Sequence, residues 1–246
     1  MKKPISLSVI TISFNSGNTI EKTVQSVLNQ DYQHIEYIIV DGGSTDNTLE
    51  IIKRYEKKFL EKGFIFKYIS EPDKGISDAF NKGTALATGD LVGIINSDDW
   101  LEQDALKVIA KNYHSNYSLY CGDLQLWEKG KLIAQRRSRP NMLWLGMYVM
   151  HPTVFVKREV YNDYQFDLNH KIAMDFDFLT RVSKYKKYRI KYLPYIISNM
   201  ELGGASSDLP KMKLEEMMVI KRNSSLTKFL LVKLLKMMEE KFLYKH

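Results

Sequence analysis

The segment "DLVGIINSDDW" at residues 90–100 runs from an apolar stretch directly into two neighbouring carboxylates. A short apolar run of this kind predicts a buried strand, which places Asp98 and Asp99 at its end. Adjacent ionised carboxylates repel each other, and a hard cation with oxygen ligands, Mn²⁺ or Mg²⁺, would remove that cost. In the alternative interpretation, Asp98 caps the following helix and Asp99 is solvated.

Strand and helix patterns alternate from the amino terminus up to this segment. The expected strands lie at 5–13, 35–43, 64–70 and 90–96, and the expected helices at 18–30, 44–58 and 76–88. Ser44 is the expected N-cap of the second helix. Because the strands are apolar throughout rather than alternating, the sequence predicts an α/β fold in which helices cover both faces of a mostly parallel sheet.

Parallel strands end at one edge of a sheet, and ligands of such folds bind there. Asn15, Asp41 and the stretch "DKG" at 73–75 follow the first three predicted strands. We expect Asp41 to accept the imide N–H of a uracil, and the 73–75 stretch to contact the base or ribose and a phosphate. Two alternatives stay open, in which Asp41 only forms a turn and Lys74 is only a solvated side chain.

The composition, 44% hydrophobic and 26% charged over 246 residues, is that of a globular protein. The single cysteine, Cys121, permits no internal disulfide and indicates a cytoplasmic location, and the histidines show no zinc spacing. No apolar run reaches the roughly 18 residues of a membrane span. The glycine motifs of dinucleotide-binding and P-loop enzymes are absent, and no nucleic-acid-binding motif is present.

Basic residues concentrate at 211–246, where nine Lys or Arg and four Glu give a net charge of +5 out of +7 for the chain. Helical spacing places the apolar residues Leu231, Leu235, Met238 and Phe242 on one stripe of a helix. It places the basic residues Lys233 and Lys236 on another stripe. We expect a basic amphipathic helical tail. It lies either on an anionic membrane surface or against its own domain or a partner subunit.

The stretches "SVITISFN", "VDGGSTDNT", "SEPDKGISDAFNKG" and "ATGDLVGIINSDDW" resemble glycosyltransferase family 2, inverting enzymes of the GT-A fold that use nucleotide sugars. The resemblance is dense over 5–104. It continues in "HPTVFVKREVY" at 151–161, similar to an acceptor-side segment, and in "MDFDFLTRV" at 174–182, similar to the stretch that holds the catalytic base.

The resemblance implies a set of residues that bind the nucleotide sugar: Thr11, Ser13, Asn15, Asp41, Gly42, Ser44, Asp73, Lys74, Gly75, Asp78, Asn81, Asn96, Ser97 and Asp98. Many members have Asp at the position of Asn96. The metal, Mn²⁺ or Mg²⁺, is therefore expected on Asp98 and Asp99.

On the acceptor side, the resemblance implies that Asp175 is the catalytic base, with Asp177 as the second candidate. His151 follows a Trp- and Met-rich segment that lines an acceptor pocket or, in the alternative, belongs to the core. Met174 stands where many members have Glu. A carboxylate here would take the proton of an acceptor hydroxyl, whose own pKa is too high for ionisation. The alternative for Asp175 is a helix N-cap.

We therefore expect one GT-A domain at 1–210, with a nucleotide half to about 104 and an acceptor half from about 105, followed by the tail. A hairpin at 120–137 begins the acceptor half, and "LGGAS" at 202–206 is either a closing loop or a plain turn. The expected activity moves a hexose or N-acetylhexosamine from a UDP-sugar to a glycan or lipid-linked acceptor of a bacterial surface polysaccharide. A nucleotidyltransferase and a non-catalytic nucleotide-sugar-binding protein are the alternatives.

Overall fold

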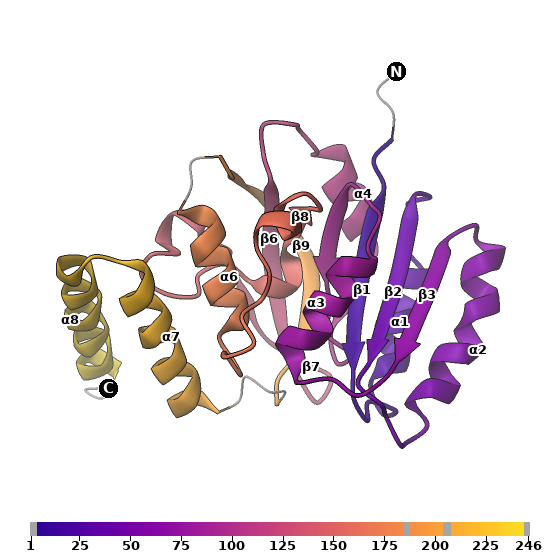
Figure 1. The fold of residues 1–246 in the computed structure, drawn as a ribbon, viewed down its shortest axis with the longest axis horizontal. Helices are drawn as coiled ribbons and strands as arrows, with labels where there is room; N and C mark the ends of the chain where they lie inside the picture. Colours follow the sequence, from indigo (N-terminus) through magenta and orange to yellow (C-terminus); the bar gives the residue numbers. More distant parts are fainter. Residues whose placement is uncertain (1–3, 185–186, 204–207, 244–246) are drawn as a thin grey trace.

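The computed structural model is an open α/β sheet with helices on both faces (Figure 1). It describes residues 4–184, 187–203 and 208–243, with side chains as far as 238. The strands are β1 Leu7–Ser13, β2 Ile35–Asp41, β3 Ile65–Ser70, β4 Leu91–Ile94, β5 Trp100–Leu101, β6 Leu119–Glu128, β7 Lys131–Arg136, β8 Phe155–Lys157 and β9 Ile190–Glu201. The helices are α1 Ile20–Leu28, α2 Thr48–Glu61, α3 Ile76–Leu86, α4 Ala105–Lys111, α5 Val160–Asp163, α6 Met174–Ser183, α7 Leu209–Asn223 and α8 Leu226–Leu243, with 3-10 turns η1 Pro140–Met142 and η2 His151–Thr153.

The strand order is β3-β2-β1-β4-β8-β6-β9-β5, and β7 pairs with β6 outside this path. The first four strands are parallel, as the sequence predicts. β8 runs antiparallel to both β4 and β6, and β9 runs parallel to β6. As a result β1, β2, β3, β4, β6 and β9 all end at the same edge of the sheet, the lower edge in Figure 1.

Two hydrophobic layers cover the parallel half of the sheet. All seven residues of β2 are buried, because alternate side chains point to opposite faces and both faces are covered. Tyr37 and Ile39 pack with α1, α2 and α4, whereas Ile38 and Val40 pack with α3 and the more distant α6. The predicted α/β architecture is confirmed.

The start of α2 differs from the prediction. The helix begins at Thr48 with Asn47 at its N-cap, so Ser44 is not the cap. The Ser44 hydroxyl instead donates to the carboxylate of Asp41, and its backbone N–H donates to the same carboxylate at 2.9 Å. A serine beside a buried acceptor is drawn away from the helix terminus.

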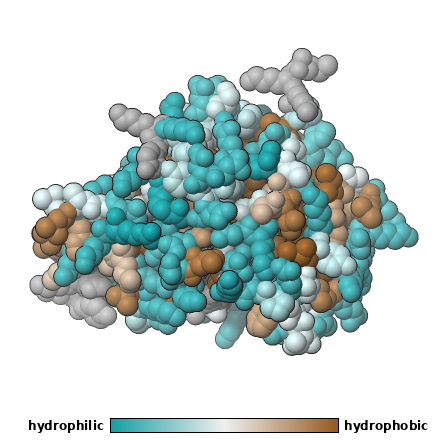
Figure 2. Space-filling view, in the orientation of Figure 1, coloured by the Kyte–Doolittle hydropathy of each residue, from teal (hydrophilic) through white to brown (hydrophobic). Residues whose placement is uncertain are grey.

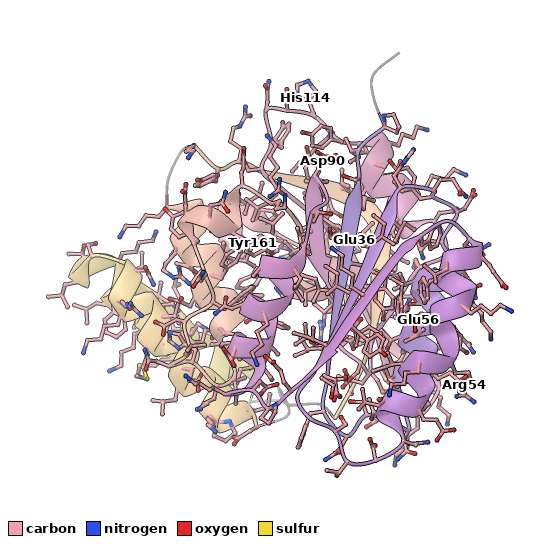
Figure 3. All side chains as sticks on the ribbon, turned by 45° about the vertical axis from the view of Figure 1, so that its right-hand side comes forward. Glu36, Arg54, Glu56, Asp90, His114 and Tyr161 are labelled. Atoms are coloured by element: carbon pink, nitrogen blue, oxygen red, sulfur yellow. The ribbon has the colours of Figure 1, made fainter. Side chains whose placement is uncertain are left out.

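A buried carboxylate joins three elements at the opposite end of the sheet. Glu36 of β2 accepts hydrogen bonds from Ser8, from Thr88 and from Lys67, which is 2.7 Å away. In Figure 3 Glu36 lies against the sheet, and Asp90 and His114 lie further up, away from the edge where β1 and β2 end. These residues therefore belong to the scaffold.

The segment expected to form a basic tail consists of the two helices α7 and α8. Val219, Ile220 and Val232 of these helices are buried in the same core as α6. The boundary expected at residue 210 therefore does not coincide with a break in packing. Among the described residues, no helix combines the length and apolar character that crossing a membrane requires.

Candidate active site

Three loops at the carboxyl edge of the sheet are fastened to one another by hydrogen bonds. The Asn15 backbone N–H donates to the Ser44 hydroxyl at 2.8 Å, and the Asn15 side chain accepts from the backbone of Thr45 at 2.9 Å. The hydroxyls of Ser16 and Ser97 are 2.8 Å apart. The loops after β1, β2 and β4 thus form one preorganised surface, as the sequence predicts from the common edge.

Asp41 lies beneath this surface, not on it. Its carboxylate is fully buried and accepts from the hydroxyls of Ser13 at 3.0 Å and Ser70 at 2.7 Å, as well as from Ser44 and the N–H of Gly43. A carboxylate oxygen has about two acceptor sites, so these donors occupy the group. In this arrangement Asp41 holds three strand ends together, which differs from the expected direct contact with a base.

Three other residues, Phe14, Gly42 and Asp73, lie close together at the end of β2. Phe14 is 64% exposed, although a phenylalanine that follows a buried strand is normally covered. A Cβ atom added to Gly42 would lie 2.6 Å from the Asp73 carboxylate and 3.4 Å from the Phe14 ring, so a larger residue here would displace the Asp73 side chain. The sequence predicted Gly42 and Asp73 here but missed Phe14, whose signal is an aromatic residue placed just beyond the strand.

The stretch from Lys74 to Asp78 shapes the start of α3. Gly75 adopts a φ of 108° at the N-cap, a conformation that other residues rarely take, and its N–H donates to Asp73 at 2.8 Å. The Asp78 carboxylate accepts from the backbone N–H of Lys74 at 3.1 Å. The Lys74 side chain is exposed and free to reach a ligand phosphate.

Two predicted ligand residues face the interior. The Thr11 hydroxyl is fully buried and accepts from Tyr37 at 2.9 Å on the α1 and α2 side of the sheet. Asn81 uses both ends of its amide to hold the backbone of Phe166, each at 2.9 Å. The expectation that Thr11 and Asn81 contact the nucleotide sugar through their side chains does not agree with these positions, because both side chains are used within the fold.

Three carboxylates gather after β4 and β9. Asp98 is partly exposed, whereas Asp99 is 1% exposed and accepts from the backbone N–H of Glu201 at 3.3 Å. Burial and the charge of Glu201 raise the pKa of Asp98, and burial and the charge of Asp98 raise that of Asp99 well above its ordinary value. The sequence missed Glu201 because it lies about a hundred residues from Asp98.

The alternative interpretation, in which Asp98 caps the next helix and Asp99 is solvated, is wrong in both parts. α4 begins after Asp104, so Asp98 does not cap it. Asp99 is buried and not solvated. The Asn96 amide N–H donates to the Asp99 carboxylate at 3.4 Å in this structure. Asp98 and Asp99, two neighbouring carboxylates that repel each other, offer oxygen ligands of the kind that a hard divalent cation prefers.

Asp175 lies in the first turn of α6, opposite η2. Ala173 is the N-cap of that helix, so the N-cap alternative for Asp175 is wrong. Burial raises the pKa of Asp175, opposed by the charge of His151, and burial lowers the pKa of His151. The His151 ring packs 5.5 Å from that of Phe80. The two acceptor-side residues that the sequence predicts are therefore neighbours in the structure.

Asp177 is oriented differently from Asp175. Its side chain is 0% exposed, and its Oδ2 accepts from Arg181 Nε at 2.7 Å. Its other oxygen has no hydrogen-bond partner and lies 3.8 Å from His170 Nε2. Asp177 therefore points away from Asp175, because successive helical residues point about 100° apart, and its role as the second candidate base stays a prediction.

Asp167, His170 and Asp177 each offer one atom to a group that spans at most 4.8 Å, which a metal ion could in principle join. However, Arg222 pairs with Asp167 at 2.8 Å and Arg181 pairs with Asp177. Both carboxylates are thus already paired with arginines, which makes this cluster a poor site for a divalent ion. The "LGGAS" stretch cannot be compared in the same way, because 204–206 lie outside the described residues.

The sheet order, the covered faces and the ligand edge define a GT-A fold. A mannosyltransferase from Pyrobaculum calidifontis, solved with GDP-Man and Mn²⁺, superimposes with a TM-score of 0.70 at 17% identity over 91% of this chain and 66% of that one. Residues 1–349 of Staphylococcus aureus TarS with UDP-GlcNAc give 0.66 at 22% identity over 88% and 65%. Residues 8–189 match Glycosyl transferase family 2, and the chain belongs to that family.

Curated relatives are longer than this chain. The hyaluronan synthase of Pasteurella multocida is 29% identical over 217 residues, which are 85% of this chain and 22% of that protein. The chain spans between about a fifth and a third of the first three curated relatives it matches.

Proposed function

We propose that the chain is an inverting glycosyltransferase that moves a hexose or N-acetylhexosamine from a UDP-sugar to a glycan or lipid-linked acceptor of a bacterial surface polysaccharide. The observation that carries the proposal is that Asp98 and the buried Asp99 follow β4 at the edge where the loops after β1 and β4 are hydrogen-bonded to each other, with the charge of Glu201 near enough to raise the pKa of both. Family membership and relatives named hyaluronan synthase and chondroitin synthase support the polymer class.

The nucleobase is proposed to lie on the exposed ring of Phe14. Stacking of a base on an aromatic ring contributes about 1–3 kcal/mol. The Asp73 carboxylate beside Gly42 is then the acceptor nearest to the imide N–H of a uracil. Asp41 supports this site from below by holding Ser13, Ser44 and Ser70 in place.

Asp98 is the proposed cation ligand closest to the donor, with Asp99 behind it and Glu201 beside it. Mn²⁺ or Mg²⁺ bound here would neutralise charge that develops on the departing diphosphate. The exposed Lys74 and backbone N–H groups of the loops can donate to the same phosphates.

Asp175 is the proposed base. An acceptor hydroxyl oxygen forms a bond to the anomeric carbon while the bond from that carbon to the diphosphate oxygen breaks, and the hydroxyl proton passes to Asp175. A pKa raised by burial makes the Asp175 carboxylate a stronger base than an exposed aspartate. Attack from the face opposite the diphosphate inverts the anomeric centre.

A screen of nucleotide sugars tests the donor site. UDP-sugars with Mn²⁺ or Mg²⁺ should raise the melting temperature of the protein, because binding to the native state stabilises it by RT ln(1 + [L]/Kd). Asp98→Asn should lose this metal-dependent rise, and the matched control Asp104→Asn, an exposed residue before α4, should keep it. Release of pyrophosphate from a nucleoside triphosphate would instead indicate a nucleotidyltransferase, and binding without sugar transfer would indicate a binding protein.

We also propose that the outer face of α8 lies on the inner surface of a bacterial membrane. Leu230 is 53% exposed and Leu234 55% exposed on this face, with Lys233 beside them. Figure 2 shows the corresponding hydrophobic cluster at the left-hand end of the molecule, where Figure 1 places α8. Apolar residues flanked by lysine suit an anionic lipid interface.

Flotation with phosphatidylglycerol vesicles tests this surface. Leu230→Ser with Leu234→Ser should reduce vesicle binding, and Leu60→Ser, which alters an equally exposed leucine of α2, should not. Equal binding by all three proteins would contradict the membrane proposal. A smaller size of the protein in solution on α8 substitution would also contradict it, by indicating that this face binds a partner subunit.

A further inference from the structure

Glu215 of α7 holds the chain segment that leads into α6. Its carboxylate accepts from three consecutive backbone N–H groups, those of Lys171 at 3.1 Å, Ile172 at 2.9 Å and Ala173 at 3.0 Å. Ala173 has no side chain that could cap the helix. The carboxylate that fixes the start of α6 therefore comes from a helix about 40 residues further along the chain.

Glu215 is itself held in place. It is 9% exposed, and its neighbours on α7, Val219 and Ile220, are buried in the core shared with α6. Burial acts to raise the pKa of Glu215, but the three backbone donors and the charge of His170 outweigh it and lower that pKa. The group is ionised at neutral pH, which strengthens its bonds to the backbone.

The next residue holds the second acceptor-side segment. Glu216 accepts from the backbone N–H of Met147 at 2.8 Å, four residues before His151, and pairs with Lys236 of α8. An added Cβ at Gly146 would lie 2.5 Å from this carboxylate, which shows how closely the segment approaches α7. Adjacent carboxylates on one helix thus contact the backbone segments that carry Asp175 and His151.

We propose that Glu215 and Glu216 are positioning residues that fix Asp175 and His151 against the acceptor, an inference that rests on the proposed function of Asp175. Each holds its segment through backbone hydrogen bonds and touches no reacting atom, and the charge of Glu216 also acts to raise the pKa of Asp175. A proton acceptor must lie within about 3 Å of the hydroxyl it serves, and a displacement of about 1 Å can reduce a rate about a hundredfold. Fixing the segment before α6 limits such displacement.

The test compares Glu215→Gln, Glu215→Ala and the surface control Glu56→Gln of α2 for sugar transfer and for donor binding. Glutamine retains a carbonyl acceptor but no charge, so we expect kcat to fall about tenfold in Glu215→Gln and about a hundredfold in Glu215→Ala. The KM for the UDP-sugar, and the rise in melting temperature caused by UDP with Mn²⁺, should stay at wild-type values. Glu56→Gln should match the wild type throughout.

Two further variants separate the possible failures. Glu216→Gln changes the contacts with Met147 and Lys236 and leaves the bonds to 171–173 intact. We expect it to lower kcat by itself, so it tests the inference even if Glu215→Ala does not fold. If Asp175→Asn transfers sugar at the wild-type rate, the proposed base is wrong. If Asp175→Asn is inactive but folded Glu215 and Glu216 variants keep the wild-type kcat, the positioning inference alone is overturned. Parallel losses of kcat, donor affinity and melting temperature would also overturn it, by indicating a general structural role.

Discussion

Replacing Glu36 by glutamine should destabilise the protein without touching the active site. The Glu36 side chain is 3% exposed and accepts from Lys67 Nζ at 2.7 Å, from the Thr88 N–H and hydroxyl at 2.7 and 2.9 Å, and from the Ser8 hydroxyl. An amide keeps one acceptor oxygen but turns an NH₂ group toward donors. About two hydrogen bonds are lost, each contributing about 1–3 kcal/mol when one partner is charged.

The expected loss in the free energy of unfolding is about 2–4 kcal/mol, because Lys67 is 39% exposed and can turn to water, which limits the cost. For a chain of this length that corresponds to a fall in melting temperature of about 5–15 °C. The control is Glu56→Gln, the same chemical change at an exposed position on α2, which is labelled with Glu36 in Figure 3.

The pH dependence gives a second measurement of the same interaction. Burial alone would raise the pKa of Glu36, but the hydrogen bonds from Lys67, Ser8 and Thr88 hold it below the ordinary value of 4.5. A depressed folded-state pKa stabilises the protein above the unfolded-state value, and this contribution is lost as the pH falls through the folded-state value. Urea unfolding should therefore show a large difference between wild type and Glu36→Gln at neutral pH that closes in the acid range. Equal stability of Glu36→Gln and Glu56→Gln at neutral pH, or a difference that persists in acid, would refute the reasoning.

Three shorter predictions concern the site and the core. Because the pKa of Asp175 is raised, sugar transfer should decline with falling pH earlier than an aspartate of ordinary pKa would allow, and a pH profile of kcat/KM without an acid limb would contradict Asp175 as the base. Gly93→Ala should lower stability by about 1–3 kcal/mol, since the new Cβ would lie 2.5 Å from the Phe155 ring, and calorimetry measures this loss. Thr11→Val should leave the UDP affinity unchanged and cost about 1 kcal/mol of stability through its lost bond with Tyr37, whereas weaker UDP binding with full stability would return Thr11 to the donor site.

The parallel half of the fold and its ligand edge are readable from local patterns. Apolar runs gave the strands β1, β2, β3 and β4, and their shared edge follows from parallel pairing alone. Helix boundaries were less accurate: the start of α2 moved from Ser44 to Thr48 because the Ser44 hydroxyl found a buried acceptor outside the helix.

The role of each polar residue depended on the direction in which its side chain points from the strand or helix that carries it. Thr11 lies in β1 and Asp41 lies at the end of β2. Both are buried, and their hydrogen-bond partners are brought to them by the register of β1 with β2. Asp175 and Asp177 are two residues apart on α6, and one faces His151 while the other faces Arg181. Composition and spacing do not distinguish such neighbours.

The sequence by itself determined the class of fold, the family and the edge of the sheet at which the polar loops meet, because these follow from short-range periodicity and from motifs contained within single loops. Only the tertiary structure joined Glu201 to the acidic pair, Phe14 to Gly42 and Glu215 to the start of α6. Each of these contacts links segments far apart in the chain, and such contacts form only when folding offsets the entropy of closing the intervening loops.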